Sequence, residues 1–478
     1  MISKVNSCAI SGIDGYIVTV EADMSNGIPS VDIVGLPDAA VKESKERVKA
    51  AVKNSGFSYP QKKIIINLAP AHTKKEGAYF DLPITIAILT SSMQLEADDL
   101  DDYVFIGELS LDGSLRSVNG VLAMTLAAKE HGVKNIIVPS DNAKEAAVAE
   151  GINVFGAENL AEVVSHLSGG EKLERVSIDI DSFFDGVADF DEDFADVKGQ
   201  AGAKRALEVA AAGGHNLIMI GAPGSGKTML AKRLVSILPA ITFSEALEVT
   251  KIYSIAGKLP PNTPIIKSRP FRSPHHTISP QAITGGGAVP KPGEISLAHR
   301  GVLFLDEFPE FRKETIDSLR QPLEDGYFTV GRVAGTFTFP SETMLIASMN
   351  PCKCGYYGDT TRKCTCLPGQ IQKYLSKISG PMLDRFDIHI EVPTVKYSEL
   401  ESTKKAESSK DIRERVNRAR NIQLERYKGK NIFSNASLSA KDLDVFCPLD
   451  NSCRTLLRNV FEKLGLSARA HSRIIKVA

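Results

Sequence analysis

Hydrophobic and polar positions follow a strand-and-helix pattern through residues 1–170. Short runs of β-branched and aromatic residues alternate with segments in which apolar residues recur at helical spacing. Turn sequences such as Asp112-Gly113 separate several of them. The predicted strands are Tyr16–Ala22, Ser30–Val34, Lys63–Leu68, Tyr103–Leu109, Asn135–Val138 and Asn153–Phe155. The predicted helices are Ala39–Asn54, Leu82–Ser92, Val121–Glu130 and Ala143–Glu150. This pattern predicts a compact α/β domain.

A second α/β pattern occupies residues 196–395, and residues 396–478 read as helical. Its predicted strands include the apolar runs at residues 217–220, 302–305 and 344–349. Segments 327–330 and 336–339 form a predicted hairpin whose basic tip contains Arg332. The helical pattern at the C-terminus continues to Ala478 without a stop signal, so we expect this region to be incomplete.

Residues 171–195 differ from both domains. Eight acidic residues lie between Val176 and Val197 without any lysine or arginine, and four phenylalanines are interleaved with them. A solvated interdomain linker is the favoured interpretation. A regulatory segment that packs on the second domain is the alternative.

Composition narrows the class of protein. The 478 residues suggest about three domains. With 43% hydrophobic and 24% charged residues, the chain has the composition of a soluble globular protein. No signal peptide and no membrane-spanning apolar run is recognisable, so we expect a cytoplasmic protein with no membrane partner. The net charge of −1 gives no global signature of nucleic-acid binding, and any such contact must come from local loops.

One stretch carries a recognisable phosphate-binding pattern, G-x-x-x-x-G-K-T, between a predicted strand and a predicted helix. Backbone N–H groups of such a loop and the positive end of the helix cradle phosphates. The lysine reaches the β- and γ-phosphates of a nucleotide, and the threonine hydroxyl binds Mg²⁺. The residues concerned are Gly221, Ala222, Pro223, Gly224, Ser225, Gly226, Lys227 and Thr228.

An acidic pair follows the apolar run at residues 302–305. Asp306 and Glu307 stand at the carboxyl end of a predicted buried strand, where doubly wound α/β sheets bind ligands. Asp306 would hold magnesium, and Glu307 would orient the attacking water. The two patterns in this order predict ATP hydrolysis with ATP and Mg²⁺ as cofactors.

The N-terminal domain resembles the proteolytic domain of Lon. The resemblance rests on the segments at residues 75–83 and 107–113, on Asn119-Gly120, and on residues 134–139. Lon uses a Ser–Lys dyad, in which the lysine serves as the base for the hydroxyl nucleophile. Tyr79 and Leu122 occupy the serine and lysine positions, and neither can perform this chemistry. The resemblance therefore implies a non-proteolytic relative.

The second domain resembles AAA+ ATPases of the clade that contains magnesium chelatase subunit I. Residues 196–200 resemble the adenine-contacting segment, and Asn350 would be the sensor that hydrogen-bonds the water or γ-phosphate. Arg385 would be an arginine finger supplied to a neighbouring subunit. Arg469, or else Arg473, would contact the nucleotide from a helical lid.

Two further motifs invite a chemical interpretation. Two C-x-C pairs, Cys352, Cys354, Cys364 and Cys366, can supply four thiolates to a structural zinc ion, with free or redox-active thiols as the alternative. The loop at residues 268–287 contains His275 and His276 and mixes arginine, histidine and phenylalanine, which suits contacts to phosphates and bases. A surface loop without a function is its other interpretation.

Together these features resemble the YifB/ComM family of magnesium-chelatase-like ATPases. The expected fold is a Lon-protease-like α/β domain, an AAA+ P-loop α/β domain with a zinc-binding insertion at 352–366, and a helical lid. The resemblance implies a ring, expected to be a hexamer, that moves along branched or single-stranded DNA during branch migration, natural transformation and recombination. The alternative is an ATPase that remodels a protein partner, as in metal insertion into a tetrapyrrole. Proteolysis is disfavoured by Tyr79 and Leu122.

Overall fold

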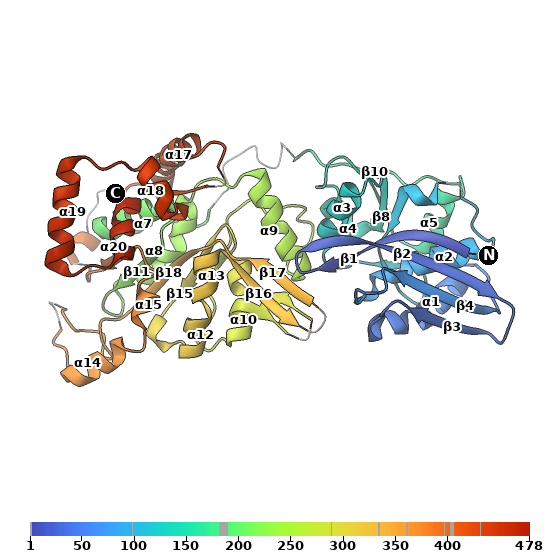
Figure 1. Cartoon of the computed structure of the whole chain (residues 1–478), viewed down its shortest axis with the longest axis horizontal. Helices are drawn as coiled ribbons and strands as arrows, with labels where there is room; N and C mark the ends of the chain where they lie inside the picture. The colour runs from blue at the N-terminus through green and yellow to red at the C-terminus, as the bar shows by residue number, and fades with distance from the viewer. Residues whose placement is uncertain are drawn as a thin grey trace. The chain divides into compact units, whose positions relative to one another are not determined.

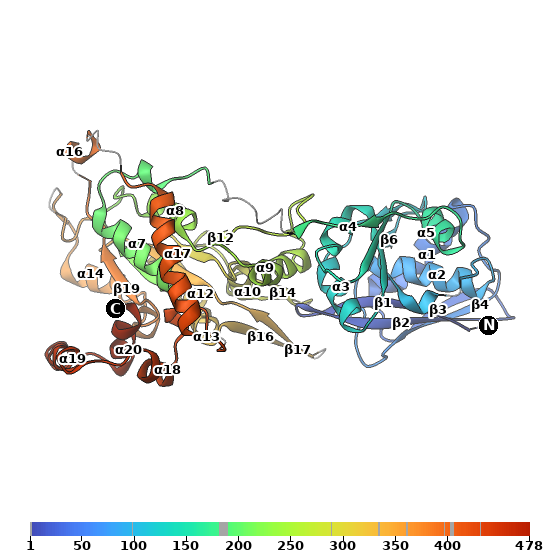
Figure 2. The ribbon, with the colours of Figure 1, turned by 90° about the horizontal axis from the view of Figure 1, so that it is seen from above.

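The computed structural model describes residues 2–97, 99–180, 190–287, 289–332, 335–359, 362–395, 397–401, 406–430 and 432–478. The chain divides into two compact units, and Figures 1 and 2 trace it from blue at the N-terminus to red at the C-terminus. The first unit comprises Met1–Val187, Ala246–Lys267 and Thr329–Phe339. The second comprises Ala188–Glu245, Ser268–Phe328 and Pro340–Ala478.

An eight-stranded mixed sheet forms the first unit, in the order β10-β9-β8-β5-β1-β2-β4-β3. Its central feature is the long antiparallel pair of β1 and β2, in register from Ile2 opposite Asp23 to Ser11 opposite Asp14. The strands are β1 (Ile2–Ser11), β2 (Asp14–Ser25), β3 (Ser30–Val34), β4 (Lys63–Ala69), β5 (Tyr103–Phe105), β8 (Asn135–Pro139), β9 (Asn153–Ala157) and β10 (Arg175–Val176).

Strand β1 was not among the predicted strands, and its inward-facing residues explain why. Two of these positions are serines, whose hydroxyls are satisfied by backbone carbonyls inside the core. Ser3 Oγ donates to Ala87 O at 2.7 Å, and Ser7 Oγ donates to Phe105 O at 3.0 Å. Since both serines are buried, the strand has no simple alternation of apolar and polar residues.

Helices α2 (Asp81–Ser91) and α3 (Val121–Glu130) pack against β1 and β2. Helix α1 (Ala39–Asn54) packs on α2 and is capped by the Asp38 side chain, which accepts from Val41 N. The predicted helix at 143–150 is instead α4 (Ser140–Ala146), and the predicted strand at 103–109 is divided into β5 and β6 (Glu108–Leu109). The remaining predicted elements of this region are confirmed to within a few residues.

The second unit contains a five-stranded, wholly parallel sheet in the order β12-β15-β18-β11-β19. Strands of such sheets are covered on both faces and therefore read as continuous apolar runs. This is why the sequence revealed three of them clearly. The strands are β11 (Leu217–Ile220), β12 (Phe271–Arg272), β15 (Val302–Leu305), β18 (Met344–Met349) and β19 (Ile388–Glu391).

C-terminal helices complete the second unit, in agreement with the predicted helical region. Helix α17 (Ser409–Arg426) packs against α7 (Ala201–Gly213), as Figure 2 shows. Arg415 of α17 pairs with Glu208 of α7 at 2.6 Å. The later helices are α18 (Ala440–Phe446), α19 (Asn451–Leu464) and α20 (Ala468–Val477). Among the described residues, no helix has both the length and the apolar character to span a bilayer.

The predicted hairpin is present as β16 (Tyr327–Arg332) and β17 (Gly335–Pro340). Residues 333 and 334 at its tip, and residues 181–189 of the acidic segment, lie outside the described residues. Both sheets and the C-terminal helices together confirm the α/β class.

Candidate nucleotide-binding site

The phosphate-binding loop follows β11 and leads into α8 (Lys227–Arg233). Gly224 and Gly226 have φ angles of 79° and 92°, a left-handed conformation that glycine adopts without strain. The Lys227 ammonium is buried and donates to Gly221 O at 2.7 Å and to Ala222 O at 2.9 Å. Burial lowers the pKa of Lys227, and the nearby carboxylates of Asp306 and Glu307 oppose this shift.

Asp306 links the end of β15 to helix α8 and to strand β18. It follows β15, and its Oδ2 accepts a hydrogen bond of 2.6 Å from Thr228 Oγ1 of α8. Its Oδ1 accepts from the hydroxyl of Ser348 on β18, the strand between β15 and β11. The carboxyl ends of these parallel strands meet at one edge, so a hydroxyl and a carboxylate suited to Mg²⁺ lie side by side.

Asn350 reaches the same place from the end of β18. Its Oδ1 lies 3.3 Å from Lys227 Nζ, and its backbone is hydrogen-bonded to the phenol of Tyr374. Tyr374 is buried, and burial raises the pKa of its phenol to about 12. Lys227, Thr228, Asp306 and Asn350, which the sequence predicted as one site, are thus brought together.

Glu307 is oriented by an unusual backbone conformation and by a histidine. Its φ angle is 52°, which is uncommon for a residue with a side chain. Its Oε2 lies 3.7 Å from His276 Nδ1, and the His276 ring lies against the tilted ring of His275 with centroids 4.1 Å apart. The predicted loop 268–287 therefore contacts the predicted catalytic carboxylate, a relationship that the sequence did not reveal.

Gln200, from the predicted adenine-contacting segment, lies against the phosphate-binding loop. Its Nε2 donates to Ser225 O at 3.1 Å and to Pro393 O at 2.6 Å. Because both partners are carbonyls, the amide orientation is determined, and Oε1 is left buried without a hydrogen-bond donor among the described residues. A buried acceptor beside the loop fits the amino group of a nucleotide base. The loop and this segment therefore suit ATP.

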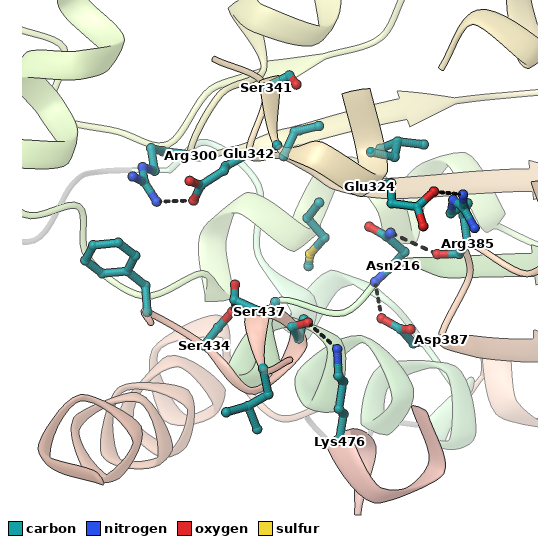
Figure 3. A pocket seen from close by; sticks show the side chains of 18 of the residues that line it. Asn216, Arg300, Glu324, Ser341, Glu342, Arg385, Asp387, Ser434, Ser437 and Lys476 are labelled. Atoms are coloured by element: carbon teal, nitrogen blue, oxygen red, sulfur yellow. Dashed lines mark hydrogen bonds and ion pairs between the residues drawn. The ribbon is translucent and has the colours of Figure 1, made fainter. Parts of the chain in front are cut away.

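The predicted arginines lie at the other end of the strands. Asn216 immediately precedes β11, and its side chain donates to Arg385 O at 2.9 Å. Four residues of β11, at about 3.3 Å each, separate this point from the phosphate-binding loop. The Arg385 guanidinium contacts Glu324 (Figure 3). Arg469 Nη2 lies 3.3 Å from the other oxygen of that carboxylate. Arg473 pairs instead with Asp387 at 3.2 Å.

Four cysteine sulfurs converge in the insertion. Cys352, Cys354, Cys364 and Cys366 place their Sγ atoms within 4.8 Å of one another, with separations of 3.4, 3.7 and 3.6 Å among the first three. Sulfurs at about 2.3 Å from a tetrahedral zinc ion would lie about 3.8 Å apart. Backbone hydrogen bonds from Thr365 and Tyr356 lower the pKa of Cys354 to about 5, whereas burial and the neighbouring sulfurs raise the pKa values of Cys364 and Cys366. The donor set therefore fits zinc.

This cysteine segment packs directly on the phosphate-binding loop. Gly355 has a φ angle of 88°, and a Cβ atom at this position would lie 2.4 Å from Pro223 Cδ. Only glycine allows so close an approach. Cys352 also follows Asn350 by two residues, so the insertion begins at the sensor itself.

Comparison with known proteins gives the same assignment. The family "Magnesium chelatase, subunit ChlI" matches residues 193–400. The family "Subunit ChlI of Mg-chelatase" matches residues 20–142, and "Magnesium chelatase, subunit ChlI C-terminal" matches residues 406–478. Competence protein ComM of Haemophilus influenzae is 45% identical over 99% of this chain and 92% of its own length. Uncharacterized protein YifB of Escherichia coli is 44% identical over 100% of the chain and 92% of its own length. The chain belongs to the ComM/YifB family of magnesium-chelatase-like AAA+ ATPases.

Membership in this family implies ATP and Mg²⁺ as cofactors and assembly into an oligomeric ring. A weaker similarity covers the N-terminal region, which is 21% identical to Lon protease of Finegoldia magna over 178 residues. At the position assigned to the Lon serine, the Tyr79 phenol hydrogen-bonds the backbone of Ile10, and Leu122 is fully buried.

Sequence reasoning missed Ser348, His276 as a partner of Glu307, and the contact of Gly355 with Pro223. Ser348 lies inside the apolar run of β18 at the position before Met349, where a polar residue is unexpected. This polar interruption of the apolar run is the sequence signal that could have identified Ser348 as a site residue. Nothing in the sequence indicates that Arg385 and Arg469 share Glu324.

Proposed function

We propose that this protein is an ATP-driven DNA translocase that works as a ring of subunits. The observation that carries the proposal is the convergence of Lys227, Thr228, Asp306 and Asn350, combined with similarity to a competence protein over 99% of the chain. Uptake and recombination of DNA during competence require an enzyme that moves strands, and a AAA+ ring supplies the motor. The resemblance to ComM-type helicases points to branched or single-stranded DNA as the substrate.

Within one subunit, each site residue has a distinct task. Lys227 and the loop N–H groups bind the phosphates, and Thr228 and Asp306 hold Mg²⁺. A magnesium ion held by these two residues would supply positive charge that offsets the charge of the nucleotide phosphates. Glu307 orients the attacking water, and Asn350 contacts the water or the γ-phosphate. His276 positions Glu307 through its 3.7 Å contact.

A neighbouring subunit completes the site. Arg385 and Arg469 lie on one carboxylate, Glu324, at the end of the strands away from their own phosphate-binding loop. Both are therefore suited to reach the nucleotide of the next subunit in a head-to-tail ring. There they would stabilise charge that develops on the γ-phosphoryl group.

DNA contacts are assigned to two surfaces. Arg332 at the hairpin is exposed, and the loop 268–287 contains the exposed His275 beside His276. Contact between His276 and Glu307 offers a direct route by which DNA bound at this loop could alter hydrolysis. Phosphate contacts of this kind predict a steep decrease of affinity with salt.

The test is a DNA-stimulated ATPase and forked-DNA unwinding assay with the wild type and Lys227→Ala. We expect DNA to stimulate hydrolysis, unwinding to require ATP, and Lys227→Ala to abolish both. The second candidate is remodelling of a protein partner, favoured by the match to the chelatase subunit. Hydrolysis that responds to a protein partner and not to any DNA would reject the translocase and support that candidate.

A further inference from the structure

A large polar cavity lies at the amino ends of the parallel strands of the second unit. Its volume is about 850 Å³. Asn216 and Gly301, which precede β11 and β15, and Met344, which begins β18, form part of its lining. Residues of the C-terminal region complete it, as Figure 3 shows for Ser434, Ser437 and Lys476. It is distinct from the phosphate-binding loop, which follows the opposite end of β11.

One end of this cavity gathers three arginines around two carboxylates. Arg269 Nη2 bonds Glu245 at 2.8 Å, and Arg300 Nη1 bonds Glu342 at 2.6 Å. Arg420 of α17 lies near Arg269, Arg300 and Glu245 but makes no hydrogen bond or ion pair with any residue that the structure describes. This end therefore carries one more positive charge than its carboxylates offset.

Burial makes this excess charge costly. Desolvation, with repulsion from Arg269 next, lowers the pKa of Arg420 to about 10. Burial also lowers the pKa of Lys476, whose ammonium donates to the carbonyl of Ala436 at 3.0 Å. A partly buried cation of this kind is stabilised when an anion enters beside it.

Neighbouring groups hold the cations in place and add neutral donors. The Arg300 guanidinium lies over the Phe433 ring, 4.9 Å from its centroid. Next to Phe433, the hydroxyls of Ser434 and Ser437 line the cavity 3.2 Å apart. Arginine forks with hydroxyl donors are the usual recognition set for phosphate oxygens.

We propose that this cavity is a second anion site, which binds a small phosphate-bearing ligand through Arg420 with support from Arg300 and Ser434. In Figure 3 the Arg300–Glu342 pair and the Glu324–Arg385 pair lie on opposite sides of the view, and both pairs line the same cavity. Arg300 precedes β15, whereas Arg420 and Ser434 belong to the C-terminal region. A bound anion would link that region to the sheet.

The experiment measures pyrophosphate binding by calorimetry in Lys227→Ala protein, in which the phosphate-binding loop is disabled. We expect one pyrophosphate per chain, and a loss of affinity of about 10- to 100-fold on adding Arg420→Gln, as for other charged hydrogen bonds. Arg418→Gln, an exposed arginine on the same helix, is the matched control and should bind like its parent. Absence of binding to the Lys227→Ala protein, or equal binding by both arginine variants, would overturn the proposal.

Thermal unfolding without added anion separates ligand binding from a structural role. Because Arg420 is half-buried and has no ion-pair partner among the described residues, Arg420→Gln should unfold at the parent temperature or above it. A clear decrease would show that Arg420 stabilises the fold and would refute the site. The last measurement is the binding of a single-stranded oligonucleotide to the same variants. If oligonucleotide binding depends on Arg420 and pyrophosphate binding does not, the surface binds DNA and the proposal is wrong.

Discussion

Thr228 Oγ1 donates a 2.6 Å hydrogen bond to Asp306 Oδ2, so the two predicted magnesium ligands are in direct contact. The other oxygen of this carboxylate is held by Ser348 from the intervening strand. Asp306 is therefore fixed from two sides before it binds a metal.

Ser348 should consequently tune magnesium affinity. We expect Ser348→Ala to raise the Mg²⁺ concentration for half-maximal ATPase activity about tenfold, as is usual when a group that orients a metal ligand is lost. Activity at saturating Mg²⁺ should change little. Ser341→Ala, which removes another buried hydroxyl bonded to Pro322 O, is the control and should keep the wild-type Mg²⁺ response. An unchanged response in Ser348→Ala would contradict this role.

His276 should affect the rate of hydrolysis and not nucleotide binding. Without its ring, Glu307 loses the 3.7 Å contact, and we expect His276→Ala to lower kcat roughly 10- to 100-fold with an unchanged KM for ATP. His275→Ala is the matched control, since His275 bonds Thr277 and not Glu307. Adding His276→Ala to Glu307→Gln should cause no further decrease in kcat. An additive decrease in kcat would show that His276 does not act through Glu307.

Arg385 should act on a neighbouring subunit, which a mixing experiment can detect. Arg385→Ala and Lys227→Ala proteins are each expected to be inactive. In mixed rings, about a quarter of the interfaces would combine an intact loop with an intact arginine, and ATPase activity should reappear. Mixtures as inactive as the separate variants would place Arg385 within its own subunit's site.

Zinc should be present at one equivalent per chain and should depend on the four cysteines. We expect the double variant Cys352→Ser with Cys354→Ser to lose the metal in elemental analysis, because two of four thiolates are removed. Cys453→Ser alters an exposed cysteine outside the cluster and should retain it. Full metal content in the double variant would disprove the site.

A buried ion pair should dominate the stability of the first unit. Arg47 pairs with the fully buried carboxylate of Asp81 at 2.7 Å, and Arg47→Met should cost about 3–5 kcal/mol of unfolding free energy. Burial raises the pKa of Asp81 to about 6 even beside Arg47. A carboxyl group with a raised folded-state pKa is favoured in its protonated form. The loss of unfolding free energy in Arg47→Met should therefore be present at pH 8 and become smaller at pH 5. Thermal unfolding at both pH values checks this, and a deficit that grows at low pH would contradict it.

The sequence predicted the parts of the site that come from the ends of buried strands. Lys227, Asp306 and Asn350 each follow an apolar run, and parallel strands must bring such positions to one edge. Contacts made by side chains from irregular segments were not predictable in this way. His276 reaches Glu307 from a loop without periodicity, and Arg385 meets Arg469 only because the C-terminal helices fold back toward the amino ends of the strands.

Strand β1 shows the same limitation within the fold. Its buried serines satisfy their hydroxyls with specific carbonyls, and such pairing exists only once the tertiary structure has formed. Gly355 is a second example. Pro223 leaves no room for a side chain at this position, and Pro223 lies far away in the sequence.

The contact between Gly355 and Pro223 has a consequence for how the ATPase would respond to oxidants. Thiolates react with oxidants and with competing metals, whereas the residues that bind and hydrolyse ATP are not affected in this way. If zinc shapes the cysteine segment, oxidation would loosen the support beneath the phosphate-binding loop and leave Lys227, Asp306 and Glu307 chemically intact. ATP hydrolysis would then stop under oxidative stress and would recover once the thiols were reduced and zinc was bound again.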